Sequence, residues 1–270
     1  MIGSLIRRSL AVACLGVLAL QPLSAAKAAS TAEIVKKGTV TIGVLTGMPP
    51  YTAVDSSGNP DGFLVDLARD AAKDMNVKLE VVPVNNSSRA AALQSGRVDF
   101  LIAQMTATPQ RALTFTMTNP YGAYEMRFVA AKSTKLTSVD DLANLRVSVP
   151  TGSTQDVAVS GLKVPGLQVV RFDDDATALQ ALISGQVDAS AQVATVANDV
   201  IAKQKLDQFE VKADVPIFTL YWSMAVRPDD TELHQWLNNF IYYEEVSGRL
   251  DELHKKWTGV PIPGGKLPAF

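Results

Sequence analysis

Apolar and polar positions along the chain follow two alternating patterns, one typical of buried strands and one of helices. Runs rich in β-branched and other apolar residues at 39–45, 78–84 and 98–104 predict strands. Between them, residues 63–75 have apolar side chains at helical spacing, and residues 88–94 form a shorter helical segment. This order of strand, helix, strand, helix and strand predicts a parallel open sheet.

The second half of the chain continues the alternation. Its predicted strands cover residues 124–131, 146–149, 169–170, 187–191 and 218–226, and its predicted helices cover residues 139–145, 155–159, 176–183, 193–203 and 232–256. The three acids Asp173, Asp174 and Asp175 predict a solvated turn that caps the helix after them, rather than a metal site. Residues 261–270 are rich in Pro and Gly and predict an extended tail.

One phrase, A-L-x-S-G-x-V-D, occurs twice, at residues 92–99 and 181–188. Each copy ends a helical pattern at a Gly and leads into an apolar run. Two copies predict two lobes of one architecture, joined by chain crossings near residues 130–132 and 224–227. Because ligands of open α/β sheets lie beyond the carboxyl ends of the strands, the segments after each repeat are expected to line a shared cleft.

The first residues differ from the rest. Arg7 and Arg8 precede an apolar stretch at residues 10–20, and Ala26-Lys27-Ala28 fits a cleavage site, which predicts a secretory signal peptide. The apolar stretch is about half of the roughly 20 residues that a membrane span needs. The predicted organisation is a signal peptide at 1–28, lobe 1 at 29–130 plus 227–260, lobe 2 at 131–226, and a C-terminal tail at 261–270.

Composition narrows the possible chemistry. Cys14, the one cysteine, lies in the predicted signal peptide, so the exported chain needs no disulfide partner. The peptide also contains three of the 25 basic residues, whereas the chain has 27 acidic ones and no basic run, which argues against nucleic acid as a partner. His234 and His254 are the only histidines and have no acid or thiol triad, so neither a metal site nor a cofactor is predicted.

The sharpest local signal is the segment T-A-T-P-Q-R at residues 106–111. Thr108 is suited to cap a helix with Pro109 at its first position, which places Arg111 in the first turn. A cation there opposes the helix dipole. Arg111 is then either a structural residue in an internal salt bridge or a guanidinium aimed at a bound carboxylate, and the spacing leaves both open.

A second signal lies at Gly152, Ser153 and Thr154, which follow a strand and open a helix. Free N–H groups at such a position attract an anion. Alone, the segment fits an ordinary serine cap. Combined with Arg111 from the facing lobe, it predicts a clamp in which a ligand carboxylate lies between a guanidinium and helix N–H groups.

Several motifs, in order along the chain, resemble the bacterial extracellular solute-binding proteins of family 3, the periplasmic amino-acid receptors of ABC importers. They are Pro50-Tyr51, G-F-L-V-D-L at 62–67, the phrase ending at Asp99, T-A-T-P-Q-R at 106–111, N-P-Y at 119–121, G-S-T at 152–154, G-R-L at 248–250 and K-K-W-T-G at 255–259. The resemblance covers nearly all of the chain after the signal peptide. It implies the type II periplasmic binding fold, an α/β architecture of two open-sheet lobes joined by a two-strand hinge.

The resemblance also implies roles for individual residues. Thr106 and Arg111 would hold the ligand α-carboxylate, and Thr154, beside Gly152 and Ser153, would close on it from lobe 2. Met48 and Asn86 occupy positions where the family often has aromatic residues against the ligand side chain. Gln104 lies where the α-ammonium is met.

Val193 departs from the family pattern, which has an acid at this position to pair with the ammonium. A buried ammonium without a charged partner is costly. Three alternatives remain open: contacts from Gln104, Gln192 and a rerouted carboxylate; a cation–π contact with Tyr121, Tyr124 or Trp222; or a ligand without an ammonium. An alignment shifted by one residue would make Gln192 the key residue.

The resemblance implies a periplasmic receptor that binds an amino acid or a related small carboxylate between its lobes and delivers it to an ABC permease in the inner membrane. Such a receptor has no catalytic residues. Two alternatives are a receptor for a carboxylate without an ammonium and an enzyme like the cyclohexadienyl dehydratases, which share the fold. A general acid with a shifted pKa in the cleft would favour the enzyme.

Overall fold

The computed structural model describes residues 30–215, 218–263 and 265–269. The predicted signal peptide therefore lies almost wholly outside the described residues. Within the described part of the chain, no helix has the length and apolar character required to cross a membrane. The tail after residue 260 has neither helix nor strand where it is described, and backbone N–H groups of Ile262 and Leu267 donate to the side chains of Asp251 and Glu245.

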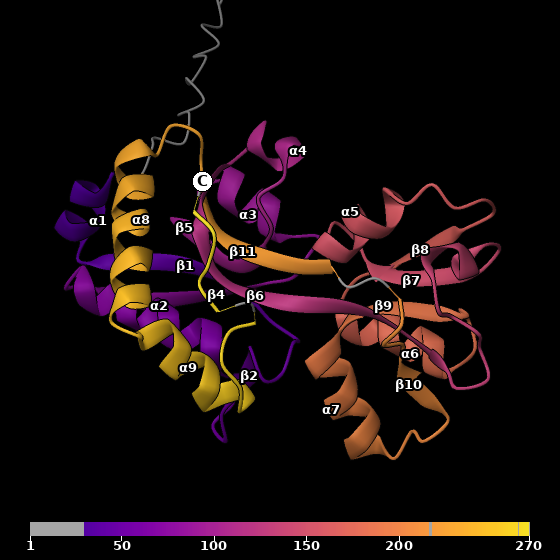
Figure 1. Ribbon diagram of the computed structural model, residues 1–270. Coiled ribbons are helices and arrows are strands. Elements are labelled where there is room, and N and C mark those ends of the chain that lie inside the picture. Colours follow the sequence, from indigo (N-terminus) through magenta and orange to yellow (C-terminus); the bar gives the residue numbers. More distant parts are fainter. Residues whose placement is uncertain (1–29, 216–217, 264, 270) are drawn as a thin grey trace, which may run out of the picture.

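Nine of the described strands form one mixed sheet in the order β4-β1-β5-β11-β6-β9-β7-β8, with β10 paired to β6 (Figure 1). These strands are β1 (Thr39–Leu45), β4 (Lys78–Val84), β5 (Phe100–Met105), β6 (Thr116–Ala131), β7 (Arg146–Pro150), β8 (Gln168–Phe172), β9 (Ala189–Val193), β10 (Phe209–Val211) and β11 (Phe218–Val226). A separate pair is formed by β2 (Ala53–Val54) and β3 (Pro60–Asp61).

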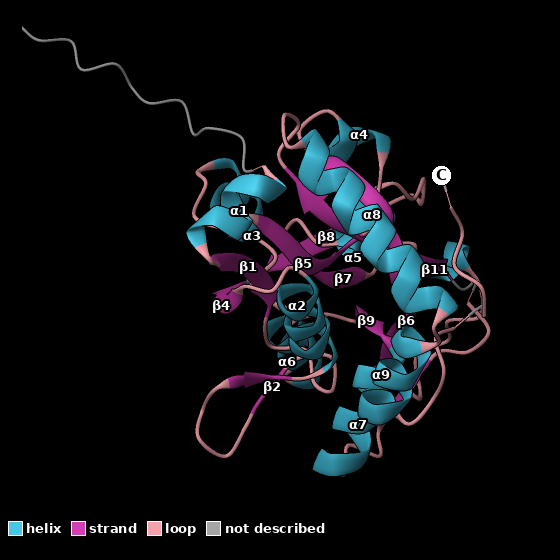
Figure 2. Cartoon of the chain, turned by 90° about the vertical axis from the view of Figure 1, so that its left-hand side faces the viewer, coloured by secondary structure: helices cyan, strands magenta, loops and turns pink. Residues whose placement is uncertain are grey.

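Helices flank this sheet. They are α1 (Thr31–Lys37), α2 (Phe63–Asp74), α3 (Arg89–Gln94), α4 (Pro109–Ala112), the 3₁₀ turn η1 (Val139–Leu142), α5 (Thr154–Ser160), α6 (Asp175–Ile183), α7 (Ala194–Gln204), α8 (Thr231–Val246) and α9 (Arg249–Thr258). Figure 2 shows α1 and α2 on opposite sides of β1. The α/β class expected from the sequence is confirmed.

Two halves of like design lie at the ends of the sheet. Strands β4, β1 and β5 are parallel in one half, and β9, β7 and β8 are parallel in the other. The repeated phrase has the same role in both. The Asp99 carboxylate accepts a bond from the Thr41 N–H at 2.8 Å, and the Asp188 carboxylate accepts one from the Arg146 N–H at 2.8 Å. Each aspartate thus joins the end of its helix unit to the neighbouring strand.

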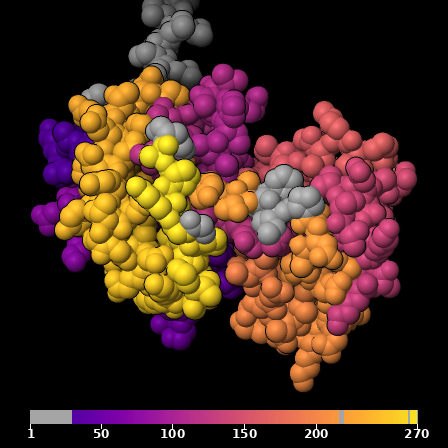
Figure 3. Space-filling model, in the orientation of Figure 1, coloured from indigo at the N-terminus to yellow at the C-terminus, as the bar shows by residue number. Residues whose placement is uncertain are grey.

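The antiparallel strands β6 and β11 connect the halves (Figure 1). Strand β6 pairs with β11 as far as Met126 and with β9 from Met126 onward, so its change of partner lies slightly before the expected crossing near residues 130–132. The space-filling view shows the surface hollowed between the halves where these strands cross (Figure 3). The lobe limits at residues 130 and 226 stay a prediction.

The helical segment expected over residues 232–256 is divided into two helices, α8 and α9. The chain turns between α8 and α9 at Gly248, whose φ of 78° lies in the left-handed region that favours glycine. Because both helices pack on the same core, the periodicity of apolar residues continues across this turn. The sequence pattern therefore gave no indication that the helix is interrupted there.

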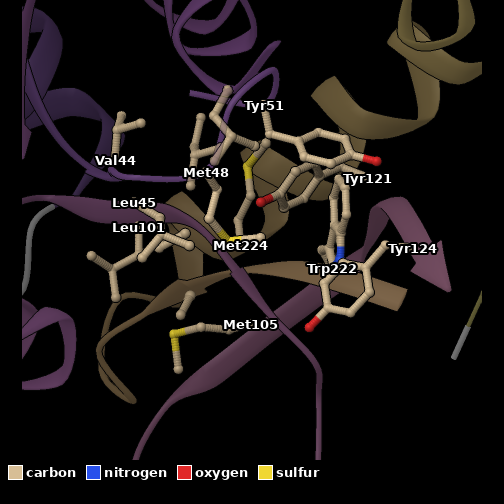
Figure 4. Packing of buried hydrophobic residues seen from close by; sticks show 14 of the residues in the cluster. Val44, Leu45, Met48, Tyr51, Leu101, Met105, Tyr121, Tyr124, Trp222 and Met224 are labelled. Atoms are coloured by element: carbon tan, nitrogen blue, oxygen red, sulfur yellow. The ribbon is translucent and has the colours of Figure 1, made fainter. Parts of the chain in front are cut away.

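An aromatic cluster fills the core where β6 and β11 run side by side. Trp222 of β11 lies 5.1 Å from Tyr51 and 5.3 Å from Tyr124, measured between ring centroids (Figure 4). Gly122 of β6 is the cross-strand partner of Trp222, and a Cβ atom there would lie 2.7 Å from the indole ring. Glycine is therefore required for the indole to lie flat against the strand.

Candidate functional site

The short helix α4 positions Arg111 as its sequence predicts. The Thr108 hydroxyl accepts a bond from the Arg111 N–H at 3.2 Å, and Pro109 is the first helical residue. The guanidinium points to the other half of the molecule, where it donates to the Thr154 hydroxyl at 3.3 Å and to the Gly152 carbonyl at 3.1 Å. It also donates to the Thr106 carbonyl at 3.0 Å. The structure therefore brings the two predicted signals together.

Arg111 is half-buried and forms no ion pair with any described carboxylate. Burial lowers the pKa of its guanidinium, because the charged form loses water. The internal salt bridge considered as an alternative is absent among the described residues.

The start of α5 differs in one respect from the predicted clamp. The Gly152 N–H donates to Asp156 at 3.1 Å and the Ser153 N–H donates to the Pro150 carbonyl at 3.1 Å, while the Ser153 hydroxyl caps Asp156. Gly152 therefore presents its carbonyl, rather than its amide, to Arg111. Thr154 is therefore the residue of α5 whose side chain faces the guanidinium. Its hydroxyl accepts the bond from Arg111, and its backbone N–H has no partner among the described residues.

Sequence reasoning missed a second guanidinium. Arg89 of α3 is only 2% exposed, donates to the Ala103 carbonyl and reaches across to the Gly152 carbonyl at 3.1 Å. Burial, with the nearby charge of Arg111, lowers the pKa of Arg89 to about 9. The signal was available, because Arg89 shares the buried face of α3 with Ala92 and Leu93 at positions i+3 and i+4.

The expectation of a solvated turn at Asp173–Asp175 that caps the next helix is correct for Asp174 and wrong for Asp175. Asp174 is the cap of α6 and accepts a bond from the Thr177 N–H at 2.8 Å, but Asp175 is only 4% exposed. Its carboxylate accepts one bond from Gln155 at 3.0 Å and one from Asn86, in the other half, at 3.2 Å. Burial raises the pKa of Asp175 to about 6. Because Asp174 caps the helix, the next residue, Asp175, is turned inward. Three consecutive aspartates in the sequence give no sign of this difference in burial.

Gln104 and Thr106 lie at the end of β5 with polar atoms that lack partners. Gln104 is 3% exposed, has a φ of 50°, and donates its backbone N–H to the Tyr121 hydroxyl at 3.0 Å. Neither atom of its side-chain amide has a hydrogen-bond partner among the described residues, and the same is true of the Thr106 hydroxyl. Buried polar groups without partners are rare in folded proteins, and they suit a polar ligand.

The remaining predicted residues are placed as follows. Met48 is buried in the cluster around Tyr51 (Figure 4). Val193 ends β9 and is buried, and the Gln192 side chain donates to Ser190 at 2.8 Å and to the Asp175 carbonyl at 3.4 Å. The contact of these residues with a ligand stays a prediction. Among the described residues, no group of three or more His, Cys, Asp or Glu side chains is arranged to hold a metal ion.

Comparisons with known proteins bear on this geometry. The family model of bacterial extracellular solute-binding proteins, family 3, matches residues 40–260. The L-cystine-binding protein TcyJ of Escherichia coli (strain K12) is 27% identical over 233 residues, which cover 85% of this chain and 86% of the relative.

Two solved structures share the fold at similar levels. The solute receptor for L-cysteine of Neisseria gonorrhoeae has a TM-score of 0.77 at 29% identity, covering 89% of this chain and 97% of the other. The ancestral amino acid-binding protein AncCDT-1, a precursor of cyclohexadienyl dehydratase, has a TM-score of 0.74 at 31% identity, covering 84% and 99%. The architecture is that of the type II periplasmic binding proteins, and the chain belongs to family 3 of the bacterial extracellular solute-binding proteins.

Proposed function

We propose that this chain is the periplasmic receptor of an ABC importer and that it binds an amino acid or a related small carboxylate between its two halves. The observation that carries the proposal is the position of the Arg111 guanidinium, which lies against Thr154 of the facing half without a described carboxylate partner. A ligand carboxylate would supply that partner. The planar fork of arginine is suited to hold both of its oxygens.

The charges between the halves support a zwitterionic ligand. Arg89, Arg111 and Asp175 are all removed from bulk water to a large degree, and none of them is in an ion pair with another described side chain. Buried charges are costly unless they are paired. An amino acid would bring an anion to the guanidinium side and a cation to the carboxylate side.

Contacts across the junction support ligand-driven closure. Arg89, Arg111 and Asn86 of one half bond to Gly152, Thr154 and Asp175 of the other. A ligand that touches both halves stabilises the closed form by its differential affinity for that form. The permease in the inner membrane then distinguishes the closed, loaded receptor from the open one.

Calorimetry on Arg111→Ala tests the proposal. A thermal-shift panel of the proteinogenic L-amino acids, L-cystine, deaminated acids and dicarboxylates first identifies a binder. We expect Arg111→Ala to weaken its binding by about thirtyfold or more, since removing one partner of a buried charge pair costs about 2–5 kcal/mol. Arg97→Ala, at an exposed arginine of the same half, is the control and should bind normally. Unchanged affinity in Arg111→Ala would contradict the site assignment.

The dehydratase alternative has a specific test. Asp175, with its pKa raised to about 6, has the property expected of a general acid in the cleft. Its two bonds from neutral amides instead stabilise the charged form, and the family is one of solute-binding proteins, so binding is favoured. Incubation with prephenate or arogenate should give no product. Turnover that Asp175→Asn abolishes would favour the enzyme.

A further inference from the structure

The Asp175 carboxylate lies where the two halves meet and is bonded from both of them. Gln155, on the same half, donates to one oxygen at 3.0 Å, and Asn86, from the facing half, donates to the other at 3.2 Å. Both donors are neutral amides. Among the described residues no lysine, arginine or histidine nitrogen forms an ion pair with this carboxylate, although the positive charge of Arg89 acts on it from farther away.

This arrangement leaves the carboxylate able to accept more. An ionised carboxylate has about four lone-pair positions, and the two side-chain amides occupy two of them. A carboxylate that is 4% exposed and held only by neutral donors gains from a cation, because charge-assisted bonds are about twice as strong as neutral ones. The Tyr124 hydroxyl donates to Gln155 at 3.1 Å and thereby fixes the orientation of the amide that holds Asp175.

The other residues predicted to meet an ammonium group, Val193, Gln192 and Gln104, have no side-chain acceptor as strong as the carboxylate of Asp175. Val193 is apolar and buried at the end of β9. The Gln192 amide nitrogen is engaged by Ser190 and by the backbone of Asp175. The side-chain amide of Gln104 lacks partners among the described residues but is uncharged. Of these described residues at the junction, Asp175 is therefore the one that carries an acid.

We propose that Asp175 accepts an ammonium group of the ligand, so that the ligand is an amino acid rather than a carboxylate without nitrogen. This inference rests on the proposed receptor function and specifies its ligand class. The ammonium is either the α-ammonium or a cationic group at the far end of the side chain. Paired ligands that lack one or the other distinguish these sources.

Asp175→Asn is the test variant and Asp174→Asn is its control. The control removes the same charge one residue away, and asparagine remains a good helix cap. Each variant is titrated by calorimetry with the amino acid that gives the largest thermal shift and with its deaminated counterpart, for example L-glutamine with glutaramate. L-arginine with L-citrulline tests the far-end cation.

We expect the wild type to prefer the ammonium-bearing member of a pair. Asp175→Asn should weaken the binding of that member by about tenfold or more and the binding of its counterpart by less than about threefold. Asp174→Asn should change neither affinity. If Asp175→Asn loses affinity for L-glutamine but not for glutaramate, Asp175 binds the α-ammonium. If it loses affinity for L-arginine but not for L-citrulline, Asp175 binds the cation at the far end of the side chain.

Three results would overturn the inference while leaving the receptor function intact. They are an equal loss for both members of each pair, which marks a structural role; no loss for either; or a wild type that prefers the deaminated acids. Failure of the receptor function is separate, because then the wild type binds no member of the panel, or Arg111→Ala binds as tightly as the wild type.

Discussion

At the scale of single residues, the buried charges of Arg89 and Asp175 and the half-buried charge of Arg111 define the junction between the halves. The position of Arg111 was predictable, because Thr108 and Pro109 are typical of a helix start and place the arginine in the first turn. Arg89 was missed although it shares the buried face of α3, whereas the burial of Asp175 depends on Asn86 and Gln155, which are distant in sequence. A buried charge leaves little trace in a local pattern when its partners are provided by the tertiary fold.

The affinity for an ammonium-bearing ligand should fall in acid. Burial raises the pKa of Asp175 to about 6; bonds from Asn86 and the charge of Arg89 lower it, and Asp174 raises it. Tyr124 and Arg111 are the other titratable groups nearby; burial raises the pKa of Tyr124 and lowers that of Arg111. The proton and the ammonium compete for one carboxylate, so the lower the pH falls below 6, the weaker the binding.

Calorimetry between pH 5 and pH 8 checks this dependence. We expect a loss of up to about tenfold per pH unit below the pKa, and a flat profile in Asp175→Asn. A sloping profile in that variant would assign the dependence to another group.

Val193→Asp should shift ligand preference toward amino acids with a free ammonium. The substitution places a carboxylate at the end of β9, where the family resemblance implies one. Val193→Asn is the matched control, because an asparagine side chain has nearly the same size as an aspartate but no charge. The ratio of affinities for an amino acid and its deaminated counterpart, measured by calorimetry, should rise in the aspartate variant only. The same ratio in both variants would place residue 193 outside the ligand's reach.

At the scale of elements, apolar patterning located the central strands. The strands at residues 39–45, 78–84 and 218–226 have the predicted bounds, because β-branched and other apolar residues predominate in each of them, although Lys78 and Glu80 are interspersed in the second. Strand β6 begins at Thr116, earlier than the predicted residue 124, since Asn119 and Pro120 read as turn residues. Pro120 instead lies opposite Ser223, at an irregularity in the pairing, where a missing N–H is tolerated.

The repeated aspartates should contribute to stability rather than to binding. Asp188 accepts a bond from the Arg146 backbone and two from its guanidinium, which also lower the pKa of Asp188, whereas the Thr41 N–H donates to Asp99. Asp188→Ala should therefore lower the free energy of unfolding by about 1–2 kcal/mol at pH 7, and Asp99→Ala by less.

Urea denaturation measures both variants. The contribution of Asp188 is present above the unfolded pKa of an aspartate and declines as the pH falls through its lowered folded value, so the difference from the wild type should shrink in acid. Ligand affinity should stay unchanged in both. A marked loss of affinity in Asp188→Ala would mean that this repeat has a part in the site.

At the scale of the whole molecule, the account predicts that binding and closure are one event. Strands β6 and β11 pass between the halves (Figure 1). Bonds from Asn86, Arg89 and Arg111 lead to the start of α5 and to Asp175, and the hydroxyls of Tyr51 and Thr195 meet across the junction at 3.5 Å. The two-lobe architecture could be inferred from the repeat. The pairing of charges across the junction required the structure.

The distance between the halves tests the central claim most directly. The one cysteine lies in the predicted signal peptide, so a mature chain can carry spin labels at Lys73→Cys on α2 and Ala202→Cys on α7, both at exposed positions. Saturation with the best-binding amino acid should move the labelled protein to a single, shorter distance, and Arg111→Ala should prevent that change. A ligand that binds by calorimetry without changing the distance, or that closes the Arg111→Ala variant equally well, would contradict the account.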